Sequence, residues 1–314
     1  MKSVTAEVAE TRASETRARI AELKYALYLM RQNPLVLVGL ILVVFFIVLT
    51  FTATLFVSPN EALKLNFGQS YCWSNPSITW TTQQASCPPG TNVVLGTDGF
   101  GRDLLRMIIL AVPLDIIISF EIVVAATVFG VFLGSAAGWI GGKIDEAVLR
   151  ITDIFFAFPG LVLALVFAAL FGRTIQTLTI AVLLVWWPTY VRLARGQVLA
   201  EKEKTYVEAL KSLGVGSGRI LLFHIIPNSI YPTIVQMTLD FGGVILTFSA
   251  LMFLGFSPSP SLPELGNLAS DGINHVFTAP WLIVFPGLTI LLISLAFNLV
   301  GDGLRDVLDP RLRR

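Results

Sequence analysis

The chain has 314 residues, of which 54% are hydrophobic and only 14% are charged. Ordinary soluble domains are about 25% charged, so the composition excludes a conventional soluble protein with a fully water-facing surface. The 22 Lys and Arg residues nearly balance the 21 Asp and Glu residues, which argues against a nucleic-acid partner because such proteins carry a basic excess. Two His and two Cys residues leave little material for a metal site, and we expect none.

The distribution of apolar residues predicts an all-α membrane protein with six transmembrane helices. A helix that crosses a hydrocarbon core of about 30 Å needs about 20 mostly apolar residues. Six stretches meet this requirement: Leu35 to Val57, Ile108 to Trp139, Ile151 to Phe171, Arg173 to Arg192, Pro227 to Phe256 and Trp281 to Val300.

Basic residues predict the orientation, because cytoplasmic loops of membrane proteins are enriched in Lys and Arg. With a cytoplasmic N-terminus, the basic residues outside are only Lys64, Arg102, Arg106 and Arg173. We therefore expect a multi-pass protein of the cell membrane (inner or plasma membrane) with both termini in the cytoplasm. The expected divisions are an interfacial helix at 1–34, a first transmembrane helix at 35–57, an extracytoplasmic loop at 58–106, a five-helix core at 107–302 with an inner loop at 192–230, and a cytoplasmic tail at 303–314.

Two segments beside the first span have their own expectations. The segment from Thr5 to Gln32 reads as a helix with one apolar stripe, which is typical of an amphipathic helix in the inner interface or of a solvated helical extension. Cys72 and Cys87 both fall in the outer loop. The outer side is oxidising, so a disulfide between them is one interpretation and two free thiols are the other.

The inner loop between the fourth and fifth spans is the most informative segment. Tyr206, Val207, Leu210 and Leu213 recur at helical spacing and form one apolar stripe. Gly214 and Gly216 are expected to end this helix, and a second short helix from Ile220 to Ile226 is expected to stop at Pro227. Two short helices joined by a glycine turn make a protrusion that needs a partner surface, the alternative being that it folds back onto the membrane or its own bundle.

The sequences EALKSLG (Glu208 to Gly214) and HIIPN (His224 to Asn228) resemble the EAA loop of ABC-importer permeases. Together with LGTDGFGRD (Leu95 to Asp103), GWIGGKIDEAVLRITD (Gly138 to Asp153) and GDGLRDVLDPRLR (Gly301 to Arg313), they resemble the C-type permease subunit of the dipeptide/oligopeptide/nickel family. The resemblance implies the type I ABC-importer permease fold. It also implies that the short helix docks into a groove on an ATP-binding subunit through Tyr206, Glu208, Ala209, Leu210, Leu213 and Gly214.

The same resemblance implies a set of partners. These are a homologous B-type permease subunit, two ABC ATPase subunits, an extracytoplasmic solute-binding protein and the lipid bilayer. The chain lacks a phosphate-binding glycine loop followed by Lys and Ser or Thr. We therefore expect no cofactor and no catalytic residue in this chain, with ATP and Mg used by the separate subunits. Alternating access would follow from ATP binding, which closes the ATPase pair and moves the docking helices together.

Charged residues at the two ends of the spans have open interpretations. Asp98, Arg102 and Asp103 form either an outer gate or scoop loop over the pathway, or an internally paired capping structure. Asp145, Arg150 and Asp153 are expected to form ion pairs that hold the hairpin of the second and third spans.

Charges at membrane depth are costly and usually face a cavity or a partner. We expect Asp240, in the fifth span, to line the translocation pathway or to pair with the partner subunit, and Glu121 to lie near the outer edge of the second span. Phe248 stands where the family usually has Glu, and Leu265 stands where it usually has Trp. We expect Asp240, Glu121 and Phe248 to contribute to the pathway.

These observations favour a permease subunit that forms half of the pore of an ATP-driven, binding-protein-dependent importer. Di- or oligopeptides are the expected substrates, and oligosaccharides or nickel chelates are the alternatives. An intramembrane enzyme is disfavoured because His224 and His275 lie on opposite sides of the membrane in the expected topology. A passive channel is the remaining alternative, and it would conduct without ATPase subunits.

Overall fold

The computed structural model describes residues 33–63, 86–90, 93–99 and 101–308. These residues form helices and connecting turns, and their one β-bridge joins Thr97 to Asp103. The expected interfacial helix from Thr5 to Gln32, most of the outer loop with Cys72, and the end of the C-terminal tail lie outside the described residues.

Five helices are long and apolar enough to cross a membrane. They are α2 (Pro34–Phe56), α4 (Leu104–Ile140), α7 (Ile175–Lys202), α11 (Tyr231–Leu251) and α13 (Trp281–Leu308). The shorter helices are α3 (Pro59–Ala62), α5 (Gly142–Phe156), α6 (Gly160–Phe171), α8 (Thr205–Ser212), α9 (Ser217–Ile220), α10 (Ile226–Ser229) and α12 (Leu265–Asp271). Two π-helical turns (Leu221–Ile225 and Met252–Phe256) and a 3-10 turn (Ile273–His275) complete the described elements.

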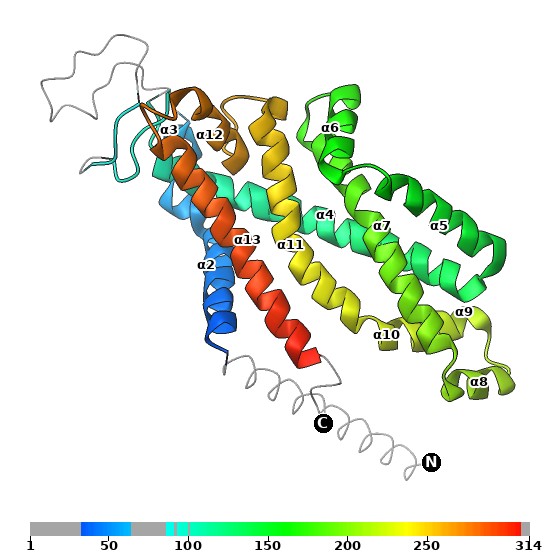
Figure 1. Ribbon diagram of the computed structural model, residues 1–314. Helices are drawn as coiled ribbons and strands as arrows, with labels where there is room; N and C mark the ends of the chain where they lie inside the picture. The colour runs from blue at the N-terminus through cyan, green and yellow to red at the C-terminus, as the bar shows by residue number, and fades with distance from the viewer. Residues whose placement is uncertain (1–32, 64–85, 91–92, 100, 309–314) are drawn as a thin grey trace, which may run out of the picture.

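The long helices form a bundle in which α11 lies between α13 and α7 (Figure 1). Helix α4 crosses behind them at a slant, and its 37 residues give a length of about 55 Å. That length exceeds a hydrocarbon core of about 30 Å, so an oblique crossing is what the helix requires. The expected first, second and sixth spans correspond closely to α2, α4 and the first part of α13.

The third expected span, Ile151 to Phe171, is not one straight helix. It is divided between α5 and α6, whose axes differ by 87°. Pro159 stands at the break, and the residue before a proline is disfavoured in helical conformation. Helix α6 has 12 residues, about 18 Å, which is too short to cross alone. Neither helix crosses alone, so the pair forms one bent span or a re-entrant loop.

Helix α5 is held to α7 by ion pairs. Asp145 accepts two hydrogen bonds from Arg195, at 2.5 and 2.6 Å, and Asp153 pairs with Arg192. Arg150 lies 3.4 Å from Glu146 on the same helix. Asp145, Arg150 and Asp153 do form ion pairs, but those of Asp145 and Asp153 join α5 to α7 and that of Arg150 lies within α5, so they do not hold the hairpin of the second and third spans as expected.

A stripe of glycines brings α4 and α7 into close contact. A Cβ atom at Gly130 would lie 2.4 Å from the Cβ of Tyr190, and one at Gly134 would lie 2.2 Å from the carbonyl oxygen of Val191. Gly138 continues the stripe one turn later, against Arg195. Small residues at this spacing allow helix backbones to approach closely in membranes. The C-terminal half of α4 is therefore locked to α7, the helix that leads into α8.

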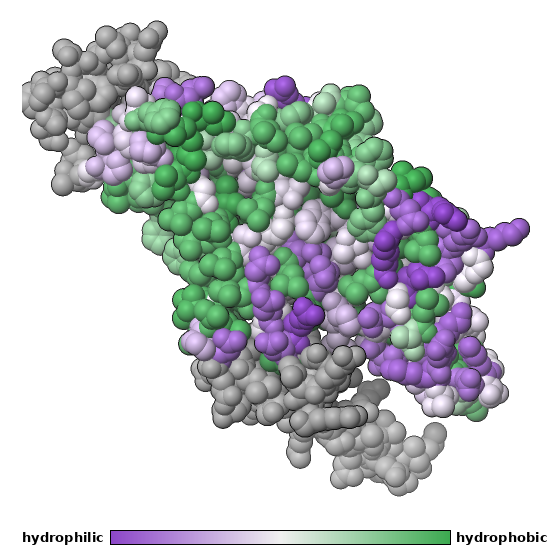
Figure 2. All heavy atoms as spheres, viewed as in Figure 1, coloured by the Kyte–Doolittle hydropathy of each residue, from purple (hydrophilic) through white to green (hydrophobic). Residues whose placement is uncertain are grey.

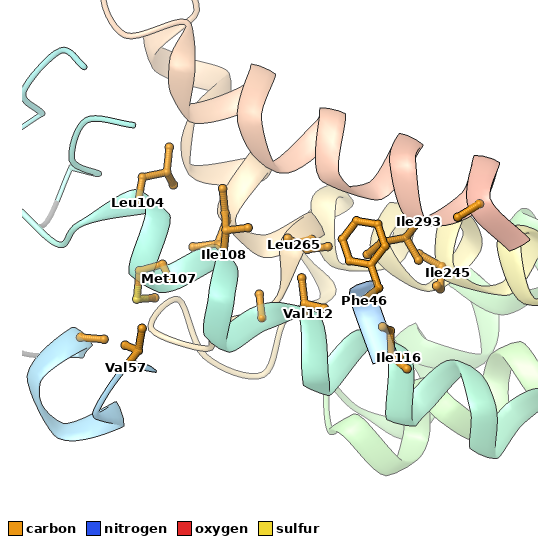
Figure 3. Close-up of a cluster of buried hydrophobic side chains, with 14 of the residues drawn as sticks. Phe46, Val57, Leu104, Met107, Ile108, Val112, Ile116, Ile245, Leu265 and Ile293 are labelled. Atoms are coloured by element: carbon orange, nitrogen blue, oxygen red, sulfur yellow. The ribbon is translucent and has the colours of Figure 1, made fainter. Parts of the chain in front are cut away.

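A second contact region lies toward the outer end of the bundle. Figure 3 shows Phe46 of α2, Met107 and Val112 of α4, Leu265 of α12 and Ile293 of α13 meeting in one buried cluster. The cluster packs α12 between the spanning helices. Figure 2 shows hydrophobic surface over α2, α13 and α6, and hydrophilic surface over α5 and α8. This distribution agrees with a bundle whose spanning helices face lipid and whose inner elements face water.

Candidate functional site

The inner protrusion begins later than the sequence predicts. Residues Arg192 to Lys202, expected in a loop at 192–230, are the last turns of α7. The protrusion therefore consists of Glu203, Lys204, α8, and the continuous helical segment from α9 through the π-helical turn to α10. Helix α7 ends at Lys202 and α8 begins at Thr205, so only Glu203 and Lys204 separate α8 from a spanning helix.

Helix α8 ends as predicted, and its end has a defined geometry. Gly214 has φ +77°, a conformation that glycine adopts without strain. The backbone N–H of Val215 donates to the carbonyl of Leu210 at 3.1 Å, and that of Gly214 donates to Lys211 at 2.9 Å. This pair of bonds is the Schellman motif. It fixes the direction in which the chain leaves α8.

The apolar stripe predicted on α8 is divided between two environments. Val207 is fully buried with Val198, Ile220 and Ile225, and Tyr206 and Leu210 pack at the edge of this cluster. Leu213 is 79% exposed, although the sequence places it on the same stripe. The stripe therefore anchors α8 through its first two turns and leaves its last apolar side chain free for another surface.

Polar contacts also hold the buried side of α8, which we call its base, to the neighbouring helices. The Tyr206 hydroxyl donates to Glu201 at 2.8 Å, and the Lys204 ammonium lies 2.6 Å from the other Glu201 oxygen. Burial raises the pKa of Tyr206, so the hydroxyl stays a donor. The Lys202 ammonium donates to the carbonyl of Trp139 at 2.7 Å, and the Trp139 ring faces Lys202 and Lys211, each 5.4 Å from its centre.

The outward face of α8 contains most of the residues predicted for docking. Glu208, Ala209, Leu213 and Gly214 are exposed, whereas Tyr206 and Leu210 are half-buried in the base. Within the described part of the chain, no side chain forms an ion pair with Glu208. The arrangement is a short, stiff helix that presents an acidic group, an alanine and a leucine to its surroundings.

The second helix of the protrusion does not stop at Pro227, as the sequence predicts. It continues through Pro227 to Ser229, because a π-helical turn precedes the proline. In this wider turn the N–H of Ile226 donates to Leu221, five residues back. A proline in a regular helix clashes with the carbonyl four residues back, and the wider turn changes the position of that carbonyl. Pro227 also lies in the first turn of α10, where a missing N–H is tolerated.

Comparisons with known proteins identify the family. Residues 126–314 match the family described as binding-protein-dependent transport system inner membrane component. The chain belongs to this family. It is 39% identical to the dipeptide transport system permease protein DppC of Alkalihalophilus pseudofirmus, over 90% of this chain and 88% of that protein.

Two further relatives support the assignment. The chain is 34% identical to the oligopeptide transport system permease protein OppC of Bacillus subtilis, over 93% of this chain and 90% of that protein. It is 37% identical to the glutathione transport system permease protein GsiD of Pectobacterium atrosepticum, over 70% of this chain and 73% of that protein. The resemblance to C-type subunits of the dipeptide/oligopeptide group is confirmed, and the chain is a multi-pass membrane permease.

The outer charged segment of this permease is an internally paired structure. Arg102 and Asp98 are both buried, with the guanidinium Nε 2.5 Å from a carboxylate oxygen of Asp98. Arg102 also approaches the carbonyl of Ser261 at 3.4 Å and Asp271 at 3.8 Å. Asp103 accepts hydrogen bonds from two N–H groups at the start of α4. The capping interpretation describes these contacts, and the role of the three residues in an outer gate or scoop loop stays a prediction.

A buried pair of two acidic side chains, Asp115 and Glu264, joins α4 to the start of α12. Asp115 of α4 accepts a hydrogen bond from the N–H of Leu265 at 3.1 Å, and Glu264 accepts one from Asn267 at 2.6 Å. Both carboxyl groups are fully buried and interact with each other. Burial raises the pKa of Glu264 to about 7. The pair fastens the start of α12 to α4.

The three pathway residues predicted from sequence lie in different environments. Asp240 is 6% exposed; it accepts a hydrogen bond from Gln236 at 2.8 Å and lies close to Tyr190. Phe248 is also buried within its own chain. Both side chains are enclosed by their own subunit, and their contribution to the pathway stays a prediction. Glu121 does reach the surface and lies near the middle of α4; its place near the outer edge of the second span and its role in the pathway stay predictions.

Other predicted features have mixed outcomes. Gly242 and Gly243 of α11 allow close approach, against Ser294 and Asn298 and against Trp186, respectively. Cys87 is not a free thiol. Cys72 lies outside the described residues, so the pairing of these two cysteines stays a prediction.

Several residues at the two ends were missed by sequence reasoning. The glycine stripe was detectable, because Gly130, Gly134 and Gly138 recur every four residues in the sequence. The roles of Glu201, Trp139 and Glu264 had no comparable local signal, since each contact joins segments distant in sequence or in different elements.

Proposed function

We propose that this chain is one of two permease subunits of an ATP-driven importer and forms half of its translocation pore. The bent α5–α6 pair counts as the sixth span, and both termini lie in the cytoplasm. The partners are a homologous B-type permease, two ABC ATPase subunits and an extracytoplasmic solute-binding protein. Family membership and the basic residues of the inner segments support this arrangement.

The substrates are di- or oligopeptides. The relatives described above are named as transporters of dipeptides, oligopeptides and glutathione, all of which contain peptide bonds. Identity between 34% and 39% over most of the chain favours peptides over the oligosaccharides and nickel chelates that the family resemblance also allowed.

Force enters the chain through α8. The observation that carries this proposal is the exposed face of Glu208, Ala209 and Leu213 on a base fixed to α7 and α4. ATP and Mg act in the partner subunits, and closure of the ATPase pair displaces α8. The Glu201–Tyr206 bond and the Trp139 contacts pass this displacement to the bundle as a rigid movement.

The docking role can be tested in the purified four-subunit complex with its binding protein. Glu208→Arg and Leu213→Asp change only exposed side chains, so the chain should insert and fold normally. We expect substrate-stimulated ATP hydrolysis to fall at least about tenfold, because a charge reversal or a buried charge at the interface is poorly tolerated. The matched control is Asp306→Arg, a charge reversal at an exposed site near the inner end of α13. Normal stimulation in both α8 variants would contradict the docking role.

Transport itself distinguishes the importer from a passive channel. The complex is reconstituted in liposomes with the binding protein and a labelled dipeptide outside. Accumulation that requires ATP supports the importer, whereas equilibration without the ATPase subunits would support a channel.

A further inference from the structure

Glu121 occupies an unusual position among the charged residues of the chain. It lies near the middle of α4, the longest helix, and its side chain is exposed on the surface of the subunit. Two other acidic residues, Asp115 and Glu264, are in contrast fully buried within the chain. Glu121 thus presents a carboxyl group outward from the middle of a helix long enough to cross a membrane.

The surroundings of Glu121 on α4 are apolar. Ile117, Val128 and Phe132 lie four residues before it and seven and eleven after it, which places them on the same helical face. They are 57%, 64% and 68% exposed. This surface, which we call the Glu121 face, is an apolar strip with one carboxyl group near its centre.

Lipid alone is a poor cover for the Glu121 face. A charged side chain in the centre of a bilayer is costly and usually faces a cavity or a partner. Within the described residues no ion pair satisfies the Glu121 carboxylate. Glutamate is also too short to extend its carboxylate to the interface from the middle of a helix, as Lys and Arg do near helix ends.

An aqueous pathway is also a poor match for this face. A water-filled surface would carry several polar groups, whereas Ile117, Val128 and Phe132 are all apolar. A single polar side chain within an apolar strip is typical of contacts between transmembrane helices, where it forms a hydrogen bond across the contact. The composition of the Glu121 face therefore favours a protein helix as its cover.

We propose that the Glu121 face packs against a transmembrane helix of the partner permease subunit, which donates a hydrogen bond or a cationic side chain to the Glu121 carboxylate. The partner is the homologous permease of the proposed function, so this inference rests on that function. The complementary group on the partner is Arg, Lys, Asn or Gln, since these side chains donate to a carboxylate. The contact positions α4, and through its glycine stripe α7, relative to the other half of the pore.

Photo-crosslinking tests where the face lies. A photoreactive phenylalanine derivative replaces Ile117 or Val128, one at a time, in the full complex with the partner permease co-expressed. We expect adducts whose mass spectra contain peptides of the partner permease. The same variants expressed without the partner should lose these adducts. Adducts with lipid only, or with a second copy of this chain, would overturn the proposal.

Substitution of Glu121 tests the chemistry. Glu121→Leu leaves the donor of the partner buried and unsatisfied, so we expect the amount of purified permease pair to fall about tenfold or more at the same expression level. Glu121→Gln keeps an acceptor, and its loss should be smaller. If lipid covered this site, leucine would instead maintain or increase the yield. The control is Glu146→Leu, an exposed residue of α5 that lies away from the Glu121 face in sequence.

The outcomes separate this inference from the proposed function. Co-purification of the partner without adducts at Ile117 and Val128, or with full yield in Glu121→Leu, would overturn the assignment of this face only. Failure of the wild-type partner to co-purify would overturn the proposed function and this assignment with it.

Discussion

Charged residues are buried at one end of the bundle and exposed at the other. At the outer end, Asp98, Arg102 and Glu264 are buried and bind one another or nearby backbone groups. At the inner end, Glu208 and Lys211 of α8 are exposed on a small helix whose buried part is apolar. Both ends contain glycines and charges in sequence, yet the buried ion pair lies at the outer end and the exposed charges of α8 lie at the inner end.

This difference indicates which end carries stability and which carries recognition. A buried ion pair is costly to break, because removal of one partner leaves an uncompensated charge. An exposed charge contributes little to folding but can be used by a docking partner. Substitutions at the outer end should therefore lower stability, and substitutions on the exposed face of α8 should lower coupling to ATP hydrolysis.

The largest expected effect is that of Arg102→Met at the outer end. The substitution leaves Asp98 buried without its cation, so we expect a loss of about 3–5 kcal/mol in the free energy of unfolding. Thermal unfolding of the purified chain in detergent measures this loss. Arg106→Met is the control, because its side chain is 53% exposed and should change stability by less than about 0.5 kcal/mol. Similar effects of the two variants would remove the contrast between the ends.

A second substitution at the outer end is Glu264→Gln. It tests, through the pH dependence of stability, whether burial raises the pKa of Glu264. The pKa of Glu264 is raised from 4.5 to about 7 by burial, so the folded state holds the proton more tightly than the unfolded state. The corresponding stability is complete below about pH 4.5 and is lost as pH rises through about 7, at up to about 1.4 kcal/mol per pH unit. Asp115 and Ser249 are the groups that face Glu264 from α4 and α11.

Melting temperatures between pH 5 and pH 8 measure this slope. Wild type should lose stability across the window, and Glu264→Gln should reduce the slope because the amide cannot ionise, while the buried Asp115 carboxyl that interacts with it remains. Glu208→Gln, at an exposed position of α8, should keep the wild-type slope. Identical slopes in all three proteins would show that Glu264 ionises in the folded state as it does in water.

Much of the fold could be predicted from the sequence, because a stretch of about 20 apolar residues is a strong local signal for a membrane-spanning helix. The bounds of α2 and the start of α13 agree with the expected spans within a residue. The bend at Pro159 was harder to predict. A proline within a span is compatible with a continuous helix, as Pro113 in α4 and Pro188 in α7 show. Only the contacts of α5 with α7 decide that the chain turns at Pro159.

The docking segment was predictable and the buried charges were not. A motif such as EALKSLG occupies consecutive residues, so its helix and its glycine end are visible in sequence. The position of Leu213 depends on which side of α8 meets Val198 and Ile225, and periodicity alone does not contain that information. Asp240 has the same limitation, because its partners Gln236 and Tyr190 determine that it is enclosed.

A smaller effect is expected for Glu201→Ala at the inner end. The substitution removes the acceptor of Tyr206 and the partner of Lys204, and we expect a loss of about 1–2 kcal/mol, since Lys204 is 57% exposed and its ion pair is screened by solvent. Faster limited proteolysis between α7 and α9, with reduced stimulation of ATP hydrolysis, would report the loosened base. Glu203→Ala, an exposed neighbour, is the matched control. If both variants resist protease equally, Glu201 does not anchor α8.

The smallest expected effect is that of Gly214→Ala, and it separates the geometry of α8 from its chemistry. Alanine at φ +77° costs about 1 kcal/mol, and nothing crowds a Cβ atom at this site, so the cost comes from the backbone alone. Gly216→Ala is the control, because Gly216 has φ −62° and equally open surroundings. We expect a small loss of stability and a measurable loss of stimulated ATP hydrolysis in Gly214→Ala only. Equal activity in the two variants would mean that the direction of the chain after α8 does not matter for docking, and that its exposed side chains alone carry the contact.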